Sequence, residues 1–168
     1  AIRFAAESVG INETFVVANG DVLTDLSVAD LLAAHHSRMA EATMHLTGVD
    51  DPSAFGVVAL EGAADGGIDR IVDFVEKPEP GAEPSNLVNA GTYVFEPSVL
   101  GLIAAGKRVS IERSIFPMLV ERGGLYGFST DDYWIDAGVP ALYRSANLDL
   151  LDGKRRTERC DAVAPGAE

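Results

Sequence analysis

The sequence predicts an α/β domain built on a mixed, mainly parallel sheet flanked by helices. Short apolar runs alternate along the chain with stretches of helical spacing, and interleaved strands and helices are typical of this class. Two of the runs, 55–60 and 70–75, are separated by an acidic, glycine-rich link, which predicts an antiparallel hairpin. At 168 residues, 47% of them hydrophobic and 23% charged, the chain can form one globular domain with a sizeable core.

The predicted strands are short runs of apolar or alternating residues. Phe15–Ala18 is apolar throughout and ends in turn residues, which predicts a strand buried on both faces. Alternation of polar and apolar residues from Ala42 to Val49 predicts another strand. Further strands are predicted at 55–60, 70–75, 88–95 and 125–128.

The predicted helices follow from spacing and from residues that favour helix starts. Helical spacing predicts a helix at 2–9. Ser27 and Ser110 can each cap a helix, and Pro97 and Pro140 each suit a first helical position. Residues 131–138 predict a polar and aromatic loop.

Composition argues against several classes of protein. The 26 acidic and 13 basic residues give a net charge of -13, whereas a nucleic-acid-binding surface needs a basic footprint. No apolar stretch is long enough to span a membrane. Cys160 is the only cysteine, so no intrachain disulfide can form, and a cytoplasmic location is expected.

From both ends of the sequence, we expect this chain to be an excerpt from a longer protein. The chain begins inside a stretch of helical spacing, without an initiating Met, and stops at 163–168 without a closing element. Residues 152–162 are charged and polar and predict a linker.

Two acidic residues stand in loops that suit a metal site. Asp21 follows the first predicted strand, where an open α/β sheet presents its ligands, and a carboxylate there can hold Mg²⁺ against a phosphate. Asn19-Gly20-Asp21 is also ordinary turn chemistry, which is the commoner meaning of the tripeptide alone. Asp136 lies in a small-residue loop, where the alternative is a tight turn with Trp134 as a core anchor. The two acids could converge on one cation.

A carboxylate and an ammonium stand side by side at Glu76-Lys77, directly after a predicted strand. Pro78 holds Lys77 out of helix and predicts an extended backbone there. The pair could accept hydrogen bonds from sugar hydroxyls and neutralise a phosphate. A surface ion pair beside a turn fits the same residues equally well.

Taken in order, these motifs resemble the sugar-nucleotide pyrophosphorylase family, which has a Rossmann-like fold of the nucleotide-diphospho-sugar transferase type. Six blocks carry the resemblance, and together they extend over almost all of residues 1–150. They are Phe-Val-Val-Ala-Asn-Gly-Asp at 15–21, Phe-Gly-Val-Val at 55–58, Phe-Val-Glu-Lys-Pro at 74–78, Asn-Ala-Gly-Thr-Tyr-Val-Phe at 89–95, Ser-Ile-Glu-Arg-x-Ile-Phe-Pro at 110–117 and Tyr-Trp-Ile-Asp-Ala-Gly at 133–138. The block at 110–117 is most similar to mannose-1-phosphate guanylyltransferases.

The resemblance implies nucleotidyl transfer from a nucleoside triphosphate to a hexose-1-phosphate, giving a sugar nucleotide and pyrophosphate. GDP-mannose synthesis is the expected case, with Mg²⁺ as cofactor. By position, the resemblance assigns catalytic roles to Asp21, Lys77 and Asp136, with both aspartates as metal ligands. The substrate-binding residues that it assigns are Gly56, Glu76, Lys77, Asn89 and Gly91.

The family's glycine-rich loop, which clamps the triphosphate, belongs at the N-terminus and is absent from this sequence. We therefore expect residues 1–151 to be a partial nucleotidyltransferase domain that holds the sugar-binding half. Residues 152–168 are expected to be a linker and, from 163–167, the start of a hexapeptide-repeat β-helix. The full-length protein is expected to form a homo-oligomer, and the chain alone is expected to be marginally folded and inactive.

Two alternatives remain open from the sequence. A non-catalytic homologue that senses sugar nucleotides or regulates a partner would also lack the glycine-rich loop. A plain α/β domain would use the same acids only as turn residues.

Overall fold

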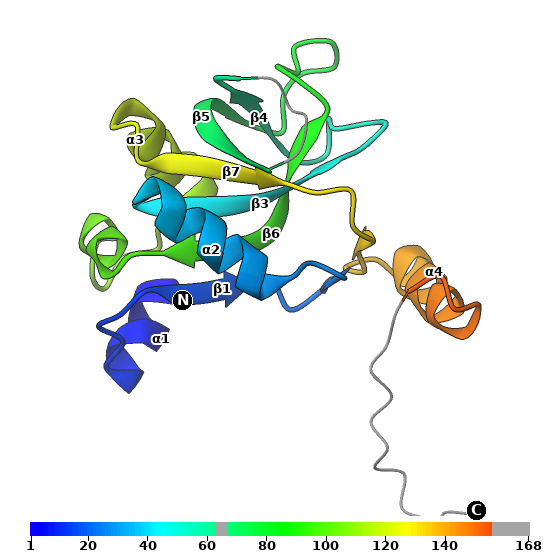
Figure 1. Cartoon of the computed structure of the whole chain (residues 1–168), viewed down its shortest axis with the longest axis horizontal. Helices are drawn as coiled ribbons and strands as arrows, with labels where there is room; N and C mark the ends of the chain where they lie inside the picture. The colour runs from blue at the N-terminus through cyan, green and yellow to red at the C-terminus, as the bar shows by residue number, and fades with distance from the viewer. Residues whose placement is uncertain (63–66, 156–168) are drawn as a thin grey trace, which may run out of the picture.

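The computed structural model describes residues 1–62 and 67–155, which form a six-stranded mixed sheet, a separate two-stranded ribbon and helices (Figure 1). The strands are β1 (Phe15–Ala18), β2 (Val22–Thr24), β3 (Ala42–Gly48), β4 (Gly56–Leu60), β5 (Gly67–Glu76), β6 (Leu87–Phe95), β7 (Leu125–Ser129) and β8 (Trp134–Asp136). The helices are α1 (Ile2–Val9), α2 (Val28–Arg38), the 3₁₀ helix η1 (Pro97–Leu102), the π-helical turn η2 (Ile111–Ile115), α3 (Phe116–Glu121) and α4 (Pro140–Leu151).

The main sheet has the strand order β1-β6-β3-β7-β5-β4. Its mixed character confirms the predicted α/β class, but the expected predominance of parallel pairs is wrong. Within the described part of the chain, β3–β7 is the one parallel ladder, and all the others are antiparallel. The length of the connection explains why β4 and β5 are antiparallel. Residues 61–66 alone join β4 to β5, too few for the crossover that a parallel pair requires.

Helices cover both faces of this sheet. His35 of α2 hydrogen-bonds Thr43 of β3, whereas Phe116 of α3 packs against Tyr93 of β6 with ring centroids 5.3 Å apart. Tyr93 is paired with Met44, the neighbour of Thr43, and successive strand residues point to opposite faces. The α2 and α3 layers therefore lie on opposite sides. The main core is on the α3 side, where Phe74 also contacts Phe116.

Strand β1 is less buried than the sequence predicts. It is hydrogen-bonded to β6 only, at one end of the sheet, and its four residues alternate between half-buried and exposed. The expected burial on both faces is wrong, because Val16 and Ala18, which share one face of the strand, are exposed. An apolar groove of about 500 Å³ runs between α1 and β1, and Phe4, Val9 and Val16 are exposed near it. Within the residues described, β1 is thus an edge strand of the main sheet with exposed apolar side chains beside it.

Helix starts follow the predicted caps. Ser27 Oγ accepts a hydrogen bond from the Asp30 backbone N–H at 3.2 Å, and Ser110 Oγ accepts one from Arg113 at the same distance. The second helix differs in form, since it begins as the π-helical turn η2 before α3. Pro117 lacks a backbone N–H and so cannot donate a helical hydrogen bond at this junction.

The segment 131–138 is not only a loop, as predicted, because it contains the strand β8 paired with β2. Neither three-residue strand has a strong local pattern, and each depends on the other for its hydrogen bonds. No helix within 1–62 or 67–155 has the length and apolar character needed to cross a bilayer. The chain described ends shortly after α4, so the predicted β-helix start at 163–167 lies outside the described residues.

Candidate functional site

The β2–β8 ribbon brings the two predicted metal ligands together. Asp136 is paired with Val22, the residue after Asp21, and the Ala137 N–H donates to the Asp21 carbonyl at 2.8 Å. A Cβ placed on Gly138 would lie 3.0 Å from Asp136 Oδ1 and 3.1 Å from Asp21 Oδ2. Both carboxylates therefore lie against the same small space, although 115 positions of sequence separate them.

This pair fits a divalent cation that takes further ligands from a substrate. Among the side chains described, no group of three or more His, Cys, Asp or Glu is placed to hold a metal ion. Mg²⁺ is commonly held by one or two carboxylates, with substrate phosphates and water completing its six oxygen ligands. The exposed Asp21 and half-buried Asp136 leave room for such ligands.

The β4–β5 hairpin builds a second part of the site. Gly56 lies directly opposite Glu76 in the ladder. A Cβ on Gly56 would come within 2.6 Å of Phe74 Cζ and 2.9 Å of Glu76 Oε2, so a larger residue would displace both side chains. Glycine at this position lets the Glu76 carboxylate lie across the neighbouring strand.

Lys77 has a left-handed backbone, and the predicted extended conformation is wrong. Its φ is +52°, and its N–H donates to the Phe55 carbonyl at 2.9 Å. Pro78 disfavours a right-handed helical backbone at Lys77, but it does not prevent a positive φ. A left-handed conformation costs a non-glycine residue roughly 1–2 kcal/mol, and such strain concentrates at functional sites. The tertiary bond to Phe55 holds the strained residue in place.

Strand β6 supplies the third part through an irregularity at Gly91. Gly91 has φ +79°, and its N–H donates to Asn89 Oδ1 at 3.0 Å. Its carbonyl accepts from the Asn19 backbone N–H at 2.8 Å, which ties the turn before Asp21 to the sheet. A Cβ on Gly91 would lie 2.7 Å from Asn19 Nδ2, so only glycine allows this approach. Asn89 is half-buried and turned partly toward its own strand.

Trp134 lies between these parts. Its indole N–H donates to the Ala90 carbonyl at 2.9 Å, and its ring meets Phe55 edge-on with centroids 5.7 Å apart. Trp134 and Thr130 also line a pocket of about 540 Å³ at the carboxyl ends of β3 and β7. The acid pair, the hairpin and β6 are thus linked by direct contacts.

Electrostatics adds two residues to the hairpin. Burial raises the pKa of Glu76, and the Glu112 carboxylate raises it further, while Lys77 and Arg113 lower it. Burial also raises the pKa of Tyr93 to about 12, opposed by a hydrogen bond from the Asn89 side chain. Glu112 and Arg113 of η2 therefore belong to the same charged group as Glu76 and Lys77.

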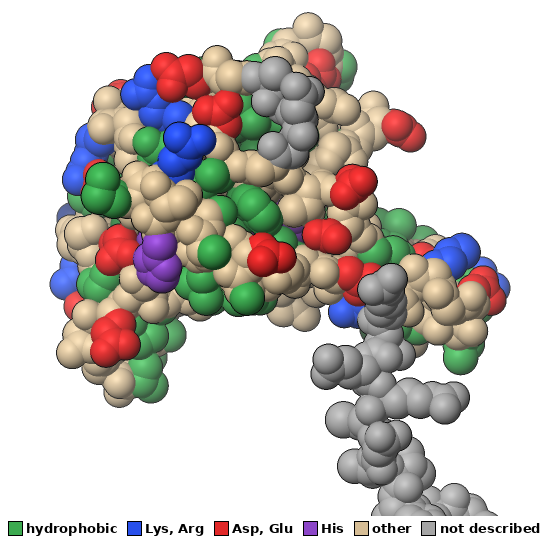
Figure 2. All heavy atoms as spheres, viewed as in Figure 1, with side chains coloured by type: hydrophobic (Ala, Val, Ile, Leu, Met, Phe, Trp, Pro, Cys, Tyr) green, Lys and Arg blue, Asp and Glu red, His purple; other side chains and the backbone are tan. Residues whose placement is uncertain are grey.

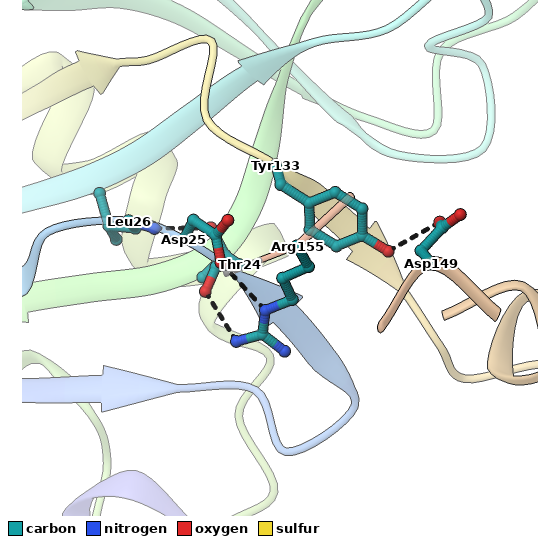
Figure 3. Close-up of polar contacts among 6 residues, drawn as sticks. All are labelled: Thr24, Asp25, Leu26, Tyr133, Asp149 and Arg155. Carbon is teal, nitrogen blue, oxygen red and sulfur yellow. Dashed lines mark hydrogen bonds and ion pairs between the residues drawn. The ribbon is translucent and has the colours of Figure 1, made fainter. Parts of the chain in front are cut away.

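The outer side of the ribbon is held by α4 and the residues after it (Figure 3). Arg155 donates to the Asp25 carboxylate at 3.0 Å and to the Thr24 carbonyl at 3.1 Å, and the Tyr133 hydroxyl donates to Asp149 at 3.0 Å. Arg155 and Asp25 are both largely shielded from solvent, so their ion pair is stronger than an exposed one. These contacts hold the ribbon to α4 and to Arg155.

Charge is unevenly distributed over the molecule. Figure 2 shows acidic side chains across the whole of this face, while Lys and Arg gather mainly at the α3 end and on α4, so the part of the face between them is negative. Such a negative region raises the local concentration of divalent cations.

The protein-family comparison settles what kind of domain this is. Residues 1–153 match the family model described as nucleotidyl transferase. The chain belongs to the nucleotidyl transferase family. The predicted family resemblance is therefore confirmed.

Relatives of this nucleotidyl transferase chain include mannose-1-phosphate guanylyltransferases. It is 41% identical over 144 residues to the protein of that name from Mycobacterium tuberculosis, covering 84% of this chain and 38% of that protein. It is 42% identical over 144 residues to the mannose-1-phosphate guanylyltransferase catalytic subunit beta of Danio rerio, covering 86% and 38%. The chain thus spans about two fifths of the length of these relatives.

Solved structures share the nucleotidyl transferase fold. A UTP-bound UGPase from Acinetobacter baumannii has a TM-score of 0.76 at 24% identity, with 89% of this chain and 56% of that chain covered. A UDP-glucose pyrophosphorylase complexed with UDP-glucose has a TM-score of 0.74 at 21% identity, with 92% and 61% covered. At these identities, the likeness supports the fold alone.

Sequence reasoning gave no site role to Glu112, Arg113 or Trp134 of this nucleotidyl transferase chain. Glu112 and Arg113 stand in one of the six blocks, directly after a helix cap, but nothing local shows that η2 reaches the β4–β5 hairpin. Trp134 enters the sequence analysis only as a core anchor in the alternative of a tight turn, and its bond to Ala90 depends on the fold. The one signal in the sequence for a site role was that Glu112 and Arg113 are charged residues shortly after the capping Ser110, within a family block.

Proposed function

We propose that the protein containing this chain transfers a nucleotidyl group from GTP to mannose-1-phosphate, releasing pyrophosphate and GDP-mannose. The placement of Asp21 and Asp136 against one small space carries the proposal, because a pair of carboxylates suits a metal bound to phosphates. Relatives named mannose-1-phosphate guanylyltransferase support the choice of substrates. We also propose that the protein is cytoplasmic and forms a homo-oligomer.

In the proposed reaction, a phosphate oxygen of the sugar-1-phosphate forms a bond to the α-phosphorus of the triphosphate. The bond from that phosphorus to the β-bridging oxygen breaks, and pyrophosphate leaves with the electron pair. No protein base is required, because a phosphate monoester has a second pKa near 6 and is already an anion at neutral pH. Catalysis then depends on positioning and charge neutralisation.

Each residue of the site has a defined role in this proposal. Asp21 and Asp136 hold Mg²⁺, which supplies positive charge against the phosphates when it is bound. Lys77 neutralises the sugar phosphate, and Glu76 accepts hydrogen bonds from sugar hydroxyls. The sugar lies against β6, where Asn89 and the Gly91 backbone line its pocket. On the opposite side of the pocket, Gly56 leaves room for the sugar because it has no side chain.

The test is pyrophosphate release by the full-length protein with GTP, mannose-1-phosphate and Mg²⁺, compared with UTP, ATP or dTTP and glucose-1-phosphate. We expect turnover with the first pair and a loss of at least about 100-fold in Asp136→Ala, the size typical of removing an electrostatic catalytic group. Asp73→Asn is the control, because Asp73 is an exposed carboxylate on β5. Absence of turnover with every pair would favour a non-catalytic homologue, and full activity in Asp136→Ala would refute the metal role.

A second test measures the activity and stability of the 168-residue chain by itself. We propose that it is inactive alone and marginally stable, because β1 and α1 leave an unpaired strand edge and exposed apolar side chains. Circular dichroism during heating and the same pyrophosphate assay are the measurements. A cooperatively folded, soluble and active 168-residue chain would show that this proposal is wrong.

A further inference from the structure

We propose that Trp134 is a positioning residue that fixes the metal-binding ribbon relative to the sugar-binding sheet. The inference rests on the proposed function, since it concerns the distance between the acid pair and the Glu76–Lys77 pair. Trp134 would act through Asp136 on one side and through β6 and Phe55 on the other.

The ribbon is a separate sheet and needs its own attachment. Strands β2 and β8 pair only with each other in the described sheets, and the ribbon lies between the main sheet and α4 (Figure 1). Two donors next to or within it reach consecutive carbonyls of β6. The Trp134 indole N–H bonds Ala90, and the Asn19 backbone N–H bonds Gly91. The metal-binding acids are therefore held at one point on the sheet.

A break in the β3–β6 ladder lies at these two residues of β6. Met44 is paired with Tyr93 and Leu46 with Asn89, so the three residues from 90 to 92 stand opposite one residue of β3. An irregularity of this kind bends a strand and leaves groups outside the ladder, and such features are common beside active sites. The positive φ of Gly91 permits the bend. In this irregular stretch the Ala90 carbonyl accepts a hydrogen bond from the ribbon, and the Gly91 carbonyl accepts one from Asn19, which directly follows β1.

Trp134 also connects directly to residues on both sides of the reaction site. It is two positions before Asp136 in β8, and alternate residues of a strand share a face, so a shift of the indole moves the metal ligand. Its ring contacts Phe55, whose carbonyl holds the strained Lys77 N–H. Trp134 thus contacts Phe55, which holds Lys77, and stands in the same short strand as Asp136.

A purely structural anchor would have different surroundings. Trp134 is only half-buried and borders the 540 Å³ pocket, and it is not a member of the main core cluster. Among the residues described, its side chain makes one hydrogen bond and one edge-on aromatic contact. Replacing it should therefore disturb geometry more than stability. A displacement of about 1 Å between reacting groups can reduce a rate by about 100-fold.

The experiment compares three versions of the full-length protein: wild type, Trp134→Phe, and a protein with 3-benzothienylalanine at position 134. The benzothienyl ring keeps the shape of indole but replaces N–H with sulfur. We expect kcat to fall by about 10-fold or more in both variants, and the Mg²⁺ concentration for half-maximal rate to rise. The Kd for mannose-1-phosphate, measured by calorimetry without metal, should change less than about twofold. Tyr143→Phe, on the exposed side of α4, is the control for aromatic replacement.

The outcomes separate the inference from the proposed function. Wild-type kinetics in the benzothienyl variant would overturn the positioning role while leaving the proposed function intact. A fall in thermal stability with unchanged kcat and metal dependence would also overturn it, because that pattern indicates a structural anchor. If the wild type itself has no turnover, both the proposed function and this inference fail.

Discussion

The carboxylates of Asp21 and Asp136 approach the same point, 3.1 and 3.0 Å from the position that a Cβ on Gly138 would occupy. A backbone hydrogen bond of 2.8 Å from Ala137 to Asp21 fixes this arrangement. The absence of a side chain at Gly138 thus keeps open the space that a cation bound by both acids would share.

Substituting this glycine should weaken metal binding without unfolding the protein. In Gly138→Ala, the new methyl group would crowd both carboxylates, so we expect the Mg²⁺ concentration for half-maximal activity to rise by about 10-fold, the equivalent of roughly 1.4 kcal/mol. Gly101→Ala is the matched control, because nothing lies within 4 Å of a Cβ there. Unchanged metal dependence in Gly138→Ala would contradict the shared site.

Lys77 should reduce the stability of the fold through its backbone while its ammonium group is needed for activity. Glycine adopts φ +52° without strain, so Lys77→Gly should be more stable than Lys77→Ala by about 1 kcal/mol. Both variants lose the ammonium group and should lose at least about 100-fold in kcat/KM for the sugar phosphate. Urea unfolding and steady-state kinetics measure the two effects. Equal stability of the variants would mean that the backbone of Lys77 is not strained.

Glu76 should make stability depend on pH in a defined direction. Its pKa is raised in the folded protein, first by burial and then by Glu112, so the unfolded chain ionises this group at lower pH than the folded one. The folded state therefore loses stability as the pH rises through the raised pKa. Glu76→Gln should raise the Tm at pH 7, and this gain should vanish below about pH 4.

The control for that experiment is Glu79→Gln, an exposed carboxylate in the following loop. Glu112→Gln should lower the pKa of Glu76 and reproduce part of the gain in Tm. Because Glu76 accepts hydrogen bonds from sugar hydroxyls in the proposed function, Glu76→Gln should at the same time raise the KM for the sugar phosphate. A Tm gain that is independent of pH would indicate a packing effect instead.

His45 should give the opposite pH dependence. It is fully buried, its Nδ1 has no hydrogen-bond partner among the residues described, and burial lowers its pKa to about 4 from an ordinary 6.5. As the pH falls from 6.5 towards 4, the unfolded chain takes up a proton that the folded protein does not. Stability should therefore decrease over this range by on the order of 2–3 kcal/mol.

Chemical denaturation of wild type and His45→Leu at pH 7 and pH 5 measures this effect. The variant should lose less stability than wild type between the two pH values, because leucine does not titrate. Its activity at pH 7 should be retained, since His45 has no role in the proposed chemistry. Parallel curves for the two proteins would show that His45 does not carry this pH dependence.

Local signals in the sequence determined much of the framework. The caps at Ser27 and Ser110, the apolar run of β1 and the glycine-rich hairpin link each depend on interactions within a few residues, so the sequence predicts them directly. The six family blocks also identified the family and the acids at 21 and 136. Whether the assigned residues perform their roles remains a prediction.

Tertiary structure alone decided how these parts meet. The β2–β8 pairing places Asp136 beside Asp21, and neither short strand has a pattern of its own. The left-handed backbone of Lys77, the exposed face of β1, the approach of Glu112 to Glu76 and the bond from Trp134 to Ala90 likewise depend on distant parts of the chain. The physical reason is that caps and strand patterns are satisfied locally, whereas hydrogen bonds across strands and burial of charge require segments that only folding brings together.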